Sequence, residues 1–400
     1  MKNLKRVLAL LSLLFLAACA PAAKAVQPGG WVNGPIHEAQ SGAADIFMVT
    51  VAAAGDPIGI DFSGSVTSGS VRAVLKDPSG QILWEQAAPA VPGPFAYTTT
   101  LRPETPGDYQ LGYAWEASTQ ATYSIVWRPE EMVRPSLTPV VLLPGIGMIL
   151  VALAFLAYSL LRRLPFRYFL FGGLAWMVTV ALKFAWAIPL NSPIYKFLTE
   201  NLPAALGFPI FYLYVGLLTG VFEVALTWLV LRYTRLGKAP WRAALAFGIG
   251  FGALEAFLLG VNSLVGTATA LLLPNILPLS TLETIAQANN WIYSLMPPWE
   301  RFFTVWIHIF CNTMLFLGVA QARPSRMWVA FLYKSLIDAL AAWVQVAGVT
   351  DVGTLWMVEG AIALWGGLGW WAVVRWVQPR YPAETPPAAA PVPEPEAAVL

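Results

Sequence analysis

Cysteine and histidine are scarce in this chain of 400 residues, which contains only Cys19, Cys311, His37 and His308. Two cysteines exclude a disulfide framework and any metal site made of thiolates alone, and two histidines limit the imidazole ligands of any metal site. Charge is also scarce, because Asp, Glu, Lys and Arg make up 12% of the residues, about half the share in ordinary soluble domains. With a net charge of +2 and no basic stretch interleaved with aromatic residues, the sequence gives no sign of a nucleic-acid surface.

Hydrophobic residues, by contrast, make up 57% of the chain, and from Leu137 on they form long runs. Each run is long enough for the roughly 20 residues that a helix needs to cross the hydrocarbon core of a bilayer. The pattern predicts an all-α bundle of seven transmembrane helices in a membrane domain at 136–378. The predicted spans are 138–161, 168–189, 207–231, 243–265, 302–321, 327–349 and 355–375.

Basic residues follow alternate spans and predict their orientation. Cytoplasmic loops carry an excess of Lys and Arg, whereas residues 243–299 contain neither. We therefore expect a multi-pass protein in the plasma membrane of a prokaryote, with its N-terminal region outside and its C-terminus in the cytoplasm. The basic residues after the first, third, fifth and seventh spans are Arg162, Arg163, Arg167, Arg232, Arg235, Lys238, Arg242, Arg323, Arg326, Arg375 and Arg380.

Both ends of the chain read as segments outside the folded domains. Residues 1–25 have a basic start, a short apolar run and small residues, which is typical of an export signal. Leu16-Ala17-Ala18-Cys19 resembles the bacterial lipobox, which predicts that Cys19 becomes the lipidated first residue of the mature chain. Ordinary cleavage after Ala23-Lys24-Ala25 would leave no lipid, and an uncleaved anchor is a third interpretation. The Pro-, Ala- and Glu-rich residues 379–400 predict a disordered cytoplasmic tail.

Residues 26–135 are more polar, and their short runs of β character are separated by Gly, Pro, Ser and Thr. Several short strands at this spacing favour a small antiparallel β-sandwich, which the export signal would place outside the cytoplasm. Its tryptophans would belong to the core or to a binding surface. The clearest predicted strands are Val71 to Lys76 and Gln81 to Glu85, which form a hairpin, then Tyr109 to Tyr113 and Ala121 to Trp127.

Ionisable side chains inside the predicted spans are the strongest functional signal. A charge in hydrocarbon costs several kcal/mol by most estimates, so each such residue is a functional-site hypothesis. Glu255 follows three glycines in the fourth span, and His308 is the only histidine of the membrane part. Helix counting puts Glu255 and Asp338 roughly 16–18 Å from the cytoplasmic edge, with His308 within reach of that level. These three residues predict a polar site inside the membrane that binds metal or carries protons.

The same side chains allow purely structural interpretations. Glu255 could be protonated and bonded to a backbone carbonyl, and His308 could be a structural hydrogen-bonding residue. Glu300, beside Arg301 at the outer end of the fifth span, could be a helix-start carboxylate that the helix dipole favours.

Two lysines lie in the spans as well, and they predict ion pairs. Glu223 and Lys334 lie at similar depths, roughly 10 Å above the cytoplasmic edge, so they could pair, and Lys183 could neutralise another carboxylate. Lys334 and Asp338 share one helix face, one turn apart. Buried pairs of this kind can fix helix registry without any chemistry.

Five short motifs occur in order across these spans. They are Gly220-Val221-Phe222-Glu223, Gly250-Phe251-Gly252-Ala253-Leu254-Glu255-Ala256, Glu300-Arg301 with His308 seven residues later, His308-Ile309-Phe310-Cys311-Asn312, and Leu336-Ile337-Asp338. With them the sequence resembles the YhfC family of intramembrane metalloproteases, in the wider clan of CAAX-processing, bacteriocin-processing and PrsW-like proteases. The resemblance covers most of 140–375 and none of the sandwich region.

The resemblance implies hydrolysis of membrane-associated peptides or proteins within the bilayer. A metal ion, zinc or another divalent cation, would lower the pKa of a bound water, and a Glu would act as general base. By this resemblance the catalytic residues are Glu223, Glu255, Glu300 and Arg301, and the metal ligands are Glu255, His308 and Asp338.

Two positions depart from the family's pattern. Val224 stands where members usually have a second Glu, and Lys334 stands where they tend to have a histidine four residues before Asp338. A lysine is no ordinary neutral ligand and would repel a dication, and a zinc site with only one histidine ligand is a poor one.

The sequence thus favours a YhfC-like protease that is either active or degenerate. It leaves open a non-catalytic scaffold or binding protein without metal, in which a Glu223–Lys334 bridge replaces the ion. A small-solute transporter is disfavoured, because internal repeats are missing from the sequence.

Overall fold

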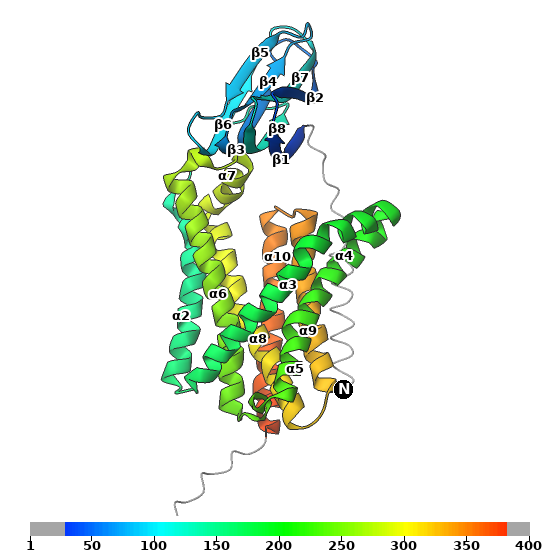
Figure 1. Cartoon of the computed structure of the whole chain (residues 1–400). Helices are drawn as coiled ribbons and strands as arrows, with labels where there is room; N and C mark the ends of the chain where they lie inside the picture. The colour runs from blue at the N-terminus through cyan, green and yellow to red at the C-terminus, as the bar shows by residue number, and fades with distance from the viewer. Residues whose placement is uncertain (1–28, 382–400) are drawn as a thin grey trace, which may run out of the picture. The chain divides into compact units, whose positions relative to one another are not determined.

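The computed structural model describes residues 29–381, which form eight β-strands and seven long helices (Figure 1). The predicted export signal with its lipobox Cys19 lies outside the described residues, as does the predicted tail from residue 382 on. The described chain divides into two compact units, residues 150–257 with 300–381 and residues 29–149 with 258–299.

The first unit contains most of the helical bundle. Seven helices of residues 29–381 are long and apolar enough to cross a membrane, in agreement with the sequence. α8 and α6 are the central ones, because 78% and 67% of their most apolar stretches are buried, against 28–44% in the other five spans. Of the elements that form these seven spans, α4 (Ala204–Thr219) and α5 (Leu226–Tyr233) together make one. The other six spans contain α2 (Leu143–Leu161), α3 (Phe166–Asn201), α6 (Trp241–Leu272), α8 (Trp291–Ala320), α9 (Ser325–Ala347) and α10 (Val352–Ala372).

Short turns with other helical geometries extend or join these helices. The segments η2 (Gly220–Ala225) and η6 (Val373–Val377) are π-helical and continue α4 and α10. The 3-10 turns are η1 (Pro139–Leu142), η3 (Arg235–Lys238), η4 (Pro274–Ile276), η5 (Gln287–Asn289) and η7 (Gln378–Arg380). Since Tyr381 after η7 still packs against the ring of Trp241, with centroids 5.4 Å apart, the folded part extends beyond residue 379, where the sequence predicts the tail to begin.

Two helices are longer than the predicted spans and contain prolines. α3 runs on through Pro189 and Pro193, and α8 starts ahead of Pro297. A proline removes one backbone donor and bends a helix, but the remaining hydrogen bonds can carry the helix on. Glu300 therefore lies well inside α8, and its interpretation as a helix-start carboxylate is wrong.

The strands of the second unit form two antiparallel sheets, as the sequence predicts. The first sheet has the order β1 (Gly30–Glu38), β8 (Thr119–Arg128), β3 (Ile58–Ser68) and β6 (Gly93–Leu101). The second has the order β2 (Gly42–Val51), β7 (Gly107–Trp115), β4 (Val71–Lys76) and β5 (Ile82–Ala87). Alternate residues of both sheets point inward and form one apolar core, with Phe62, Leu75, Leu111 and Ile125 fully buried.

The predicted hairpin is the pair β4–β5. Its turn is closed by Asp77, whose carboxylate accepts hydrogen bonds from the backbone amides of Ser79 and Gln81, each at 2.9 Å. The additional hydrogen bond from the Ser79 hydroxyl lowers the pKa of this carboxyl. Gly80 completes the turn with a φ of 87°, in the left-handed region that glycine adopts most easily.

Three of the four tryptophans of the sandwich belong to its core. Trp84, Trp115 and Trp127 pack against the apolar core, whereas Trp31 on edge strand β1 is 70% exposed.

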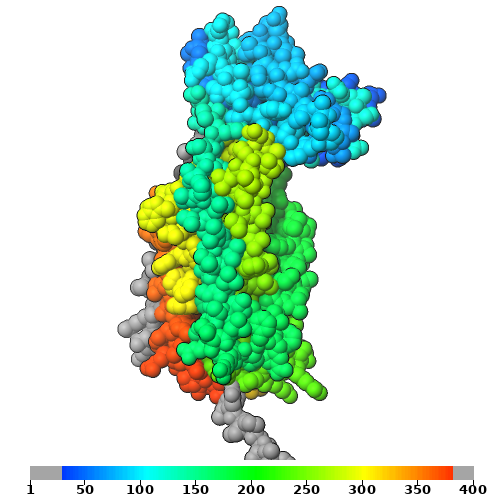
Figure 2. Space-filling view, turned by 90° about the vertical axis from the view of Figure 1, so that its left-hand side faces the viewer, coloured from blue at the N-terminus to red at the C-terminus, as the bar shows by residue number. Residues whose placement is uncertain are grey.

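A buried carboxylate joins the sandwich to the segment between α6 and α8. Asp61 of β3 is 1% exposed, and it alternates with the core residues Ile60 and Phe62, so it points away from the core. It accepts hydrogen bonds from the Thr98 hydroxyl at 2.7 Å and from the backbone N–H of Leu279 at 3.1 Å. Leu279 begins α7 (Leu279–Ala286), so Asp61 satisfies a free N–H group at that helix start. In Figure 2 the yellow-green segment that contains α7 lies against the blue and cyan strands.

Two arginines complete this polar contact. Arg134 lies 3.4 Å from Asp61 and donates to the carbonyls of Pro274 and Leu277 at 2.8 and 3.1 Å. Arg128 forms a bidentate pair with Glu283 of α7 at 2.8 and 2.9 Å. Burial raises the pKa of the Asp61 carboxyl, while the hydrogen bonds from Thr98 and Leu279 and the charge of Arg134 act to lower it. The ionised Asp61 thus depends on these donors.

The Arg134→Ala variant tests this contact. It leaves Asp61 buried without a positive charge and two carbonyls without a donor, so we expect the free energy of unfolding to fall by about 3 kcal/mol. Thermal unfolding of the full chain in detergent measures the change. The matched control is Arg72→Ala, whose exposed partner Glu85 lies 3.3 Å away and whose loss should cost less than about 1 kcal/mol. Equal effects of the two variants would contradict the role given to Arg134.

Candidate functional site

Glycines of α6 allow this helix to approach its neighbours closely. A Cβ at Gly250 would overlap the backbone carbonyl of Phe169 in α3, and a Cβ at Gly252 would lie 2.9 Å from the Cα of Val305 in α8. Small residues are what permits such close packing of membrane helices. They bring the face of α6 that carries Glu255 directly against α8.

Glu255 is the centre of a polar cluster between α6 and α8, the Glu255 cluster, made of Glu255, Glu300, Arg301 and His308. Oε2 of Glu255 lies 2.7 Å from Nε2 of His308, and its Oε1 accepts a hydrogen bond from Nη1 of Arg301. Nη2 of Arg301 donates to Oε1 of Glu300. One guanidinium therefore bridges two carboxylates, while the imidazole holds the second oxygen of Glu255.

The imidazole of His308 is fixed by its surroundings. His308 is 1% exposed, and its ring packs on the ring of Phe251 in α6 with centroids 4.9 Å apart. Asn312, which the sequence places on the same helix face, donates to the backbone carbonyl of His308 at 2.9 Å. The Asn312 side chain thus forms a hydrogen bond with the backbone of α8 and not with the imidazole, whose Nε2 contacts Glu255.

A second cluster, the Glu223 cluster, consists of Lys183, Glu223, Lys334 and Asp338. Glu223 lies in η2, and π-helical turns are frequent at functional sites. Its Oε1 lies 2.6 Å from Nζ of Lys183, and its Oε2 lies 3.7 Å from Nζ of Lys334. The Lys334 ammonium also lies 2.8 Å from Asp338, one turn further along α9. The predicted Glu223–Lys334 pair is confirmed, and the carboxylate that Lys183 neutralises is Glu223.

The two clusters are electrostatically linked but hold different residues. The charge of Lys334 acts on Glu255 as well as on Glu223. Of the three predicted metal ligands, the structure brings Glu255 and His308 together, whereas Asp338 pairs with Lys334. Counted over both clusters, four carboxylates face three permanent cations.

Glu359 of α10 is a neighbour that the sequence analysis missed. It interacts electrostatically with Glu300 and Arg301. The signal was an acidic residue inside the seventh predicted span, the same signal that singled out Glu255 and Asp338.

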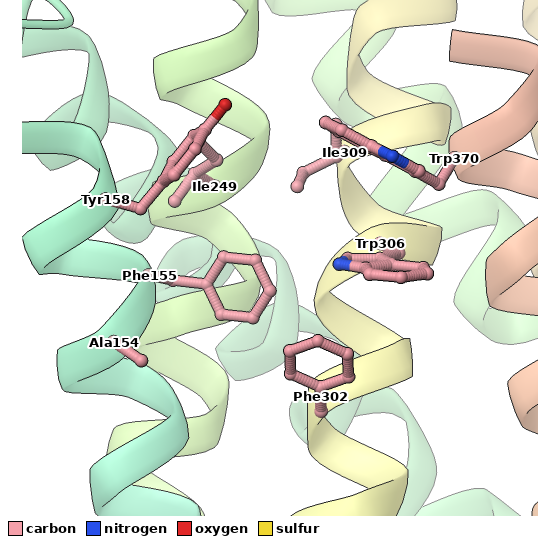
Figure 3. A pocket seen from close by; sticks show the side chains of 8 residues that line it. All are labelled: Ala154, Phe155, Tyr158, Ile249, Phe302, Trp306, Ile309 and Trp370. Carbon is pink, nitrogen blue, oxygen red and sulfur yellow. The ribbon is translucent and has the colours of Figure 1, made fainter. Parts of the chain in front are cut away.

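An apolar groove opens beside α8 in the same unit (Figure 3). Phe155 of α2 faces Phe302 and Trp306 of α8 across it, and Trp370 of α10 lines its other side. The volume is about 280 Å³, at the lower limit of the range of small-molecule sites. Ile309, the neighbour of His308, also lines the groove, so the groove and the Glu255 cluster share α8.

Comparison with protein families gives a match over this part of the chain. The model described as YhfC intramembrane metalloprotease matches residues 147–362, which is more than half of the chain and includes both clusters. The chain belongs to the YhfC intramembrane metalloprotease family. The match confirms the resemblance in the sequence, and the sandwich lies outside it. No curated protein matched the chain.

The residues that a YhfC metalloprotease would use as ligands do not fit a metal ion in this arrangement. Arg301 and His308 occupy both oxygens of Glu255, and Lys334 holds Asp338. Across residues 29–381, no group of three His, Cys, Asp or Glu side chains has the spacing that a metal site needs. The charges of Arg301 and Lys334 would also repel a dication here. The family implies a metal, yet Arg301 and Lys334 already pair with the two carboxylates that would be its ligands.

The Arg301→Gln variant tests the bridge between Glu255 and Glu300. Removal of the guanidinium leaves two partly buried carboxylates without their cation, so we expect a loss of stability of about 3 kcal/mol in thermal unfolding. The Glu255→Gln/Arg301→Gln double variant should be more stable than Arg301→Gln alone, because one of those charges is gone. Arg102→Gln, which breaks an exposed 3.6 Å pair with Glu131, is the matched control. If Arg301→Gln lowers the stability no more than Arg102→Gln does, the bridge does not stabilise the fold.

Proposed function

We propose that this YhfC-family protein hydrolyses membrane-associated peptides at the Glu255 cluster. The observation that carries the proposal is the 2.7 Å contact between the Glu255 carboxylate and the His308 imidazole, from two central helices. A carboxylate that orients an imidazole is an arrangement that hydrolases use for proton transfer. Membership of the YhfC family supports peptide hydrolysis as the reaction class.

The chain's own residues supply acid–base and electrostatic chemistry. When Nε2–H of His308 donates a hydrogen bond to Glu255, Nδ1 carries the lone pair of the neutral imidazole and can accept a proton from water. The adjacent Arg301 guanidinium can stabilise negative charge that develops on a peptide carbonyl, and Glu300 positions it. The apolar lining of the groove beside α8 supports hydrophobic peptide segments as substrates.

A second candidate function rests on the Glu223 cluster. Lys183 and Lys334 neutralise Glu223, and Lys334 neutralises Asp338 as well. Such pairs can hold helices in register without chemistry. In this alternative the protein is a non-catalytic member of the family, and its bundle binds a membrane-associated partner without cutting it.

A cleavage assay separates the two candidates. The full-length protein is reconstituted in liposomes with a panel of single-span peptides, with added zinc or with chelator, and products are identified by mass spectrometry. We expect cleavage that falls at least about 100-fold in Glu255→Gln and in His308→Ala, since a positioned acid–base group contributes that much. His37→Ala, at the exposed histidine of β1, is the matched control and should be unchanged. A folded wild-type protein that leaves every peptide intact would favour the non-catalytic candidate.

We also propose that the sandwich lies outside a prokaryotic plasma membrane, with Cys19 lipidated and the C-terminus in the cytoplasm. The support is the distribution of Lys and Arg, which lie after the first, third, fifth and seventh spans and are missing from residues 243–299. The mass of the mature N-terminal peptide tests the lipid.

Cysteine labelling in intact cells tests the orientation. Ser41 between β1 and β2 and Lys238 in η3 are both exposed, and Cys311 is buried. A membrane-impermeant maleimide should label Ser41→Cys in intact cells, and Lys238→Cys only after permeabilisation, each compared with the parent chain. The reverse pattern would invert the proposed topology.

A further inference from the structure

Three arginines meet where α8 passes into α9 and where α10 ends. Arg326 is 6% exposed, and its Nη2 donates to Gln321 at 2.5 Å. The guanidinium groups of Arg326 and Arg380 both lie over the ring of Trp376, at 5.2 and 4.7 Å from its centre. Arg323 and Arg380 are close enough to act on the charge of Arg326.

Within residues 29–381, the segments that supply these positive charges contain no acidic residue. Residues 301–337 and 360–381, which supply this end of α8, α9 and α10, contain no Asp or Glu. The charged groups that act on Arg326 are Arg323 and Arg380, which carry the same charge. Like charges repel one another, and Arg326 is buried beside the exposed Arg323 and Arg380, so the arrangement favours an added anion.

Two buried polar groups here also lack a partner. Among the described residues, neither Nη1 of Arg326 nor the hydroxyl of Tyr381 has a hydrogen-bond partner. Leaving a buried donor unpaired costs about 1–3 kcal/mol, and more for a charged group. Trp241 fixes the Tyr381 ring, and Gln321, which accepts from Arg326, also donates to the backbone carbonyl of Arg380 at 2.6 Å. The groups are therefore held in place by their own contacts.

We propose that Arg323, Arg326, Arg380 and Tyr381 form a binding site for a phosphate group. A phosphate offers several acceptor oxygens for guanidinium and hydroxyl donors, and it neutralises the cluster. Basic pockets between membrane helices take up lipid phosphates in this way, and free phosphate has the same chemistry. The site lies apart from both intramembrane clusters and does not depend on the proposed function.

Binding to the full-length protein in neutral detergent tests the site. The probes are inorganic phosphate, phosphatidylglycerol in mixed micelles, and diacylglycerol as a lipid without phosphate. Dissociation constants are measured for the wild type and for Arg326→Gln, Arg380→Gln and Tyr381→Phe. Arg232→Gln is the matched control, because Arg232 is exposed and lies over Trp228 at 4.9 Å as a single arginine–tryptophan pair.

We expect saturable binding of a phosphate probe and none of diacylglycerol. Arg326→Gln should weaken the affinity at least about tenfold, as for the loss of one charged hydrogen bond, and Arg232→Gln should leave it unchanged. Binding of phosphatidylglycerol alone identifies the lipid as the source, and binding of inorganic phosphate as well shows that the free ion suffices. If Arg326→Gln does not fold, Arg380→Gln and Tyr381→Phe give the same readout. The proposal is overturned if neither phosphate probe binds, or if Arg232→Gln weakens binding as much as the site variants.

Discussion

The need to neutralise carboxylates inside a hydrophobic bundle is the constraint on which the rest of this structure depends. The free energy needed to bury an unpaired carboxylate in a low-dielectric interior exceeds the net free energy of unfolding of a typical domain. Each acidic residue of the two clusters accordingly has a cation against it: Arg301 for Glu255 and Glu300, and lysines for Glu223 and Asp338. Three of the contacts join different elements: Lys183 of α3 and Lys334 of α9 with Glu223 of η2, and Arg301 of α8 with Glu255 of α6. The pairing of charges therefore also fixes how these helices are set against one another.

The local features of the helices serve these contacts. Gly250 and Gly252 bring α6 against its neighbours, and a Cβ at Gly216 or Gly220 would overlap Ser335 of α9. The close approach of α4 to α9 brings Glu223 within reach of Lys334. Small residues and charged residues thus work together, because a short ion pair across two helices requires that the backbones are close.

Much of the architecture could be predicted from the sequence, because hydrophobic runs and short β patterns are local signals. The seven spans, the β4–β5 hairpin and the Glu223–Lys334 pair all follow from counting along single helices or strands. The contact of Glu255 with Arg301 could not be found in this way. Arg301 was predicted to lie at the outer end of a span, whereas α8 begins ahead of Pro297 and carries Arg301 inward. The contact of Asp61 with α7 joins residues more than 200 positions apart, which no periodicity indicates.

The site differs from the expectation of three ligands around a metal because two of its positions carry cations. Asp338 forms an ion pair with Lys334 and not a contact with Glu255 or His308. Arg301 donates a hydrogen bond to an oxygen of Glu255 that a metal would need. What is left is an imidazole–carboxylate pair with permanent positive charge next to it. This pair can transfer protons, and the same charge balance is equally suited to holding the helices together.

The central claim is that Arg301, Lys183 and Lys334 pair with the intramembrane carboxylates, so that these residues form no metal site. Zinc titration of the purified full-length protein, followed by X-ray absorption at the zinc edge, tests it most directly. The account predicts no stoichiometric zinc with an imidazole ligand. One zinc per chain with nitrogen and carboxylate ligands, lost in His308→Ala while the protein remains folded, would contradict it.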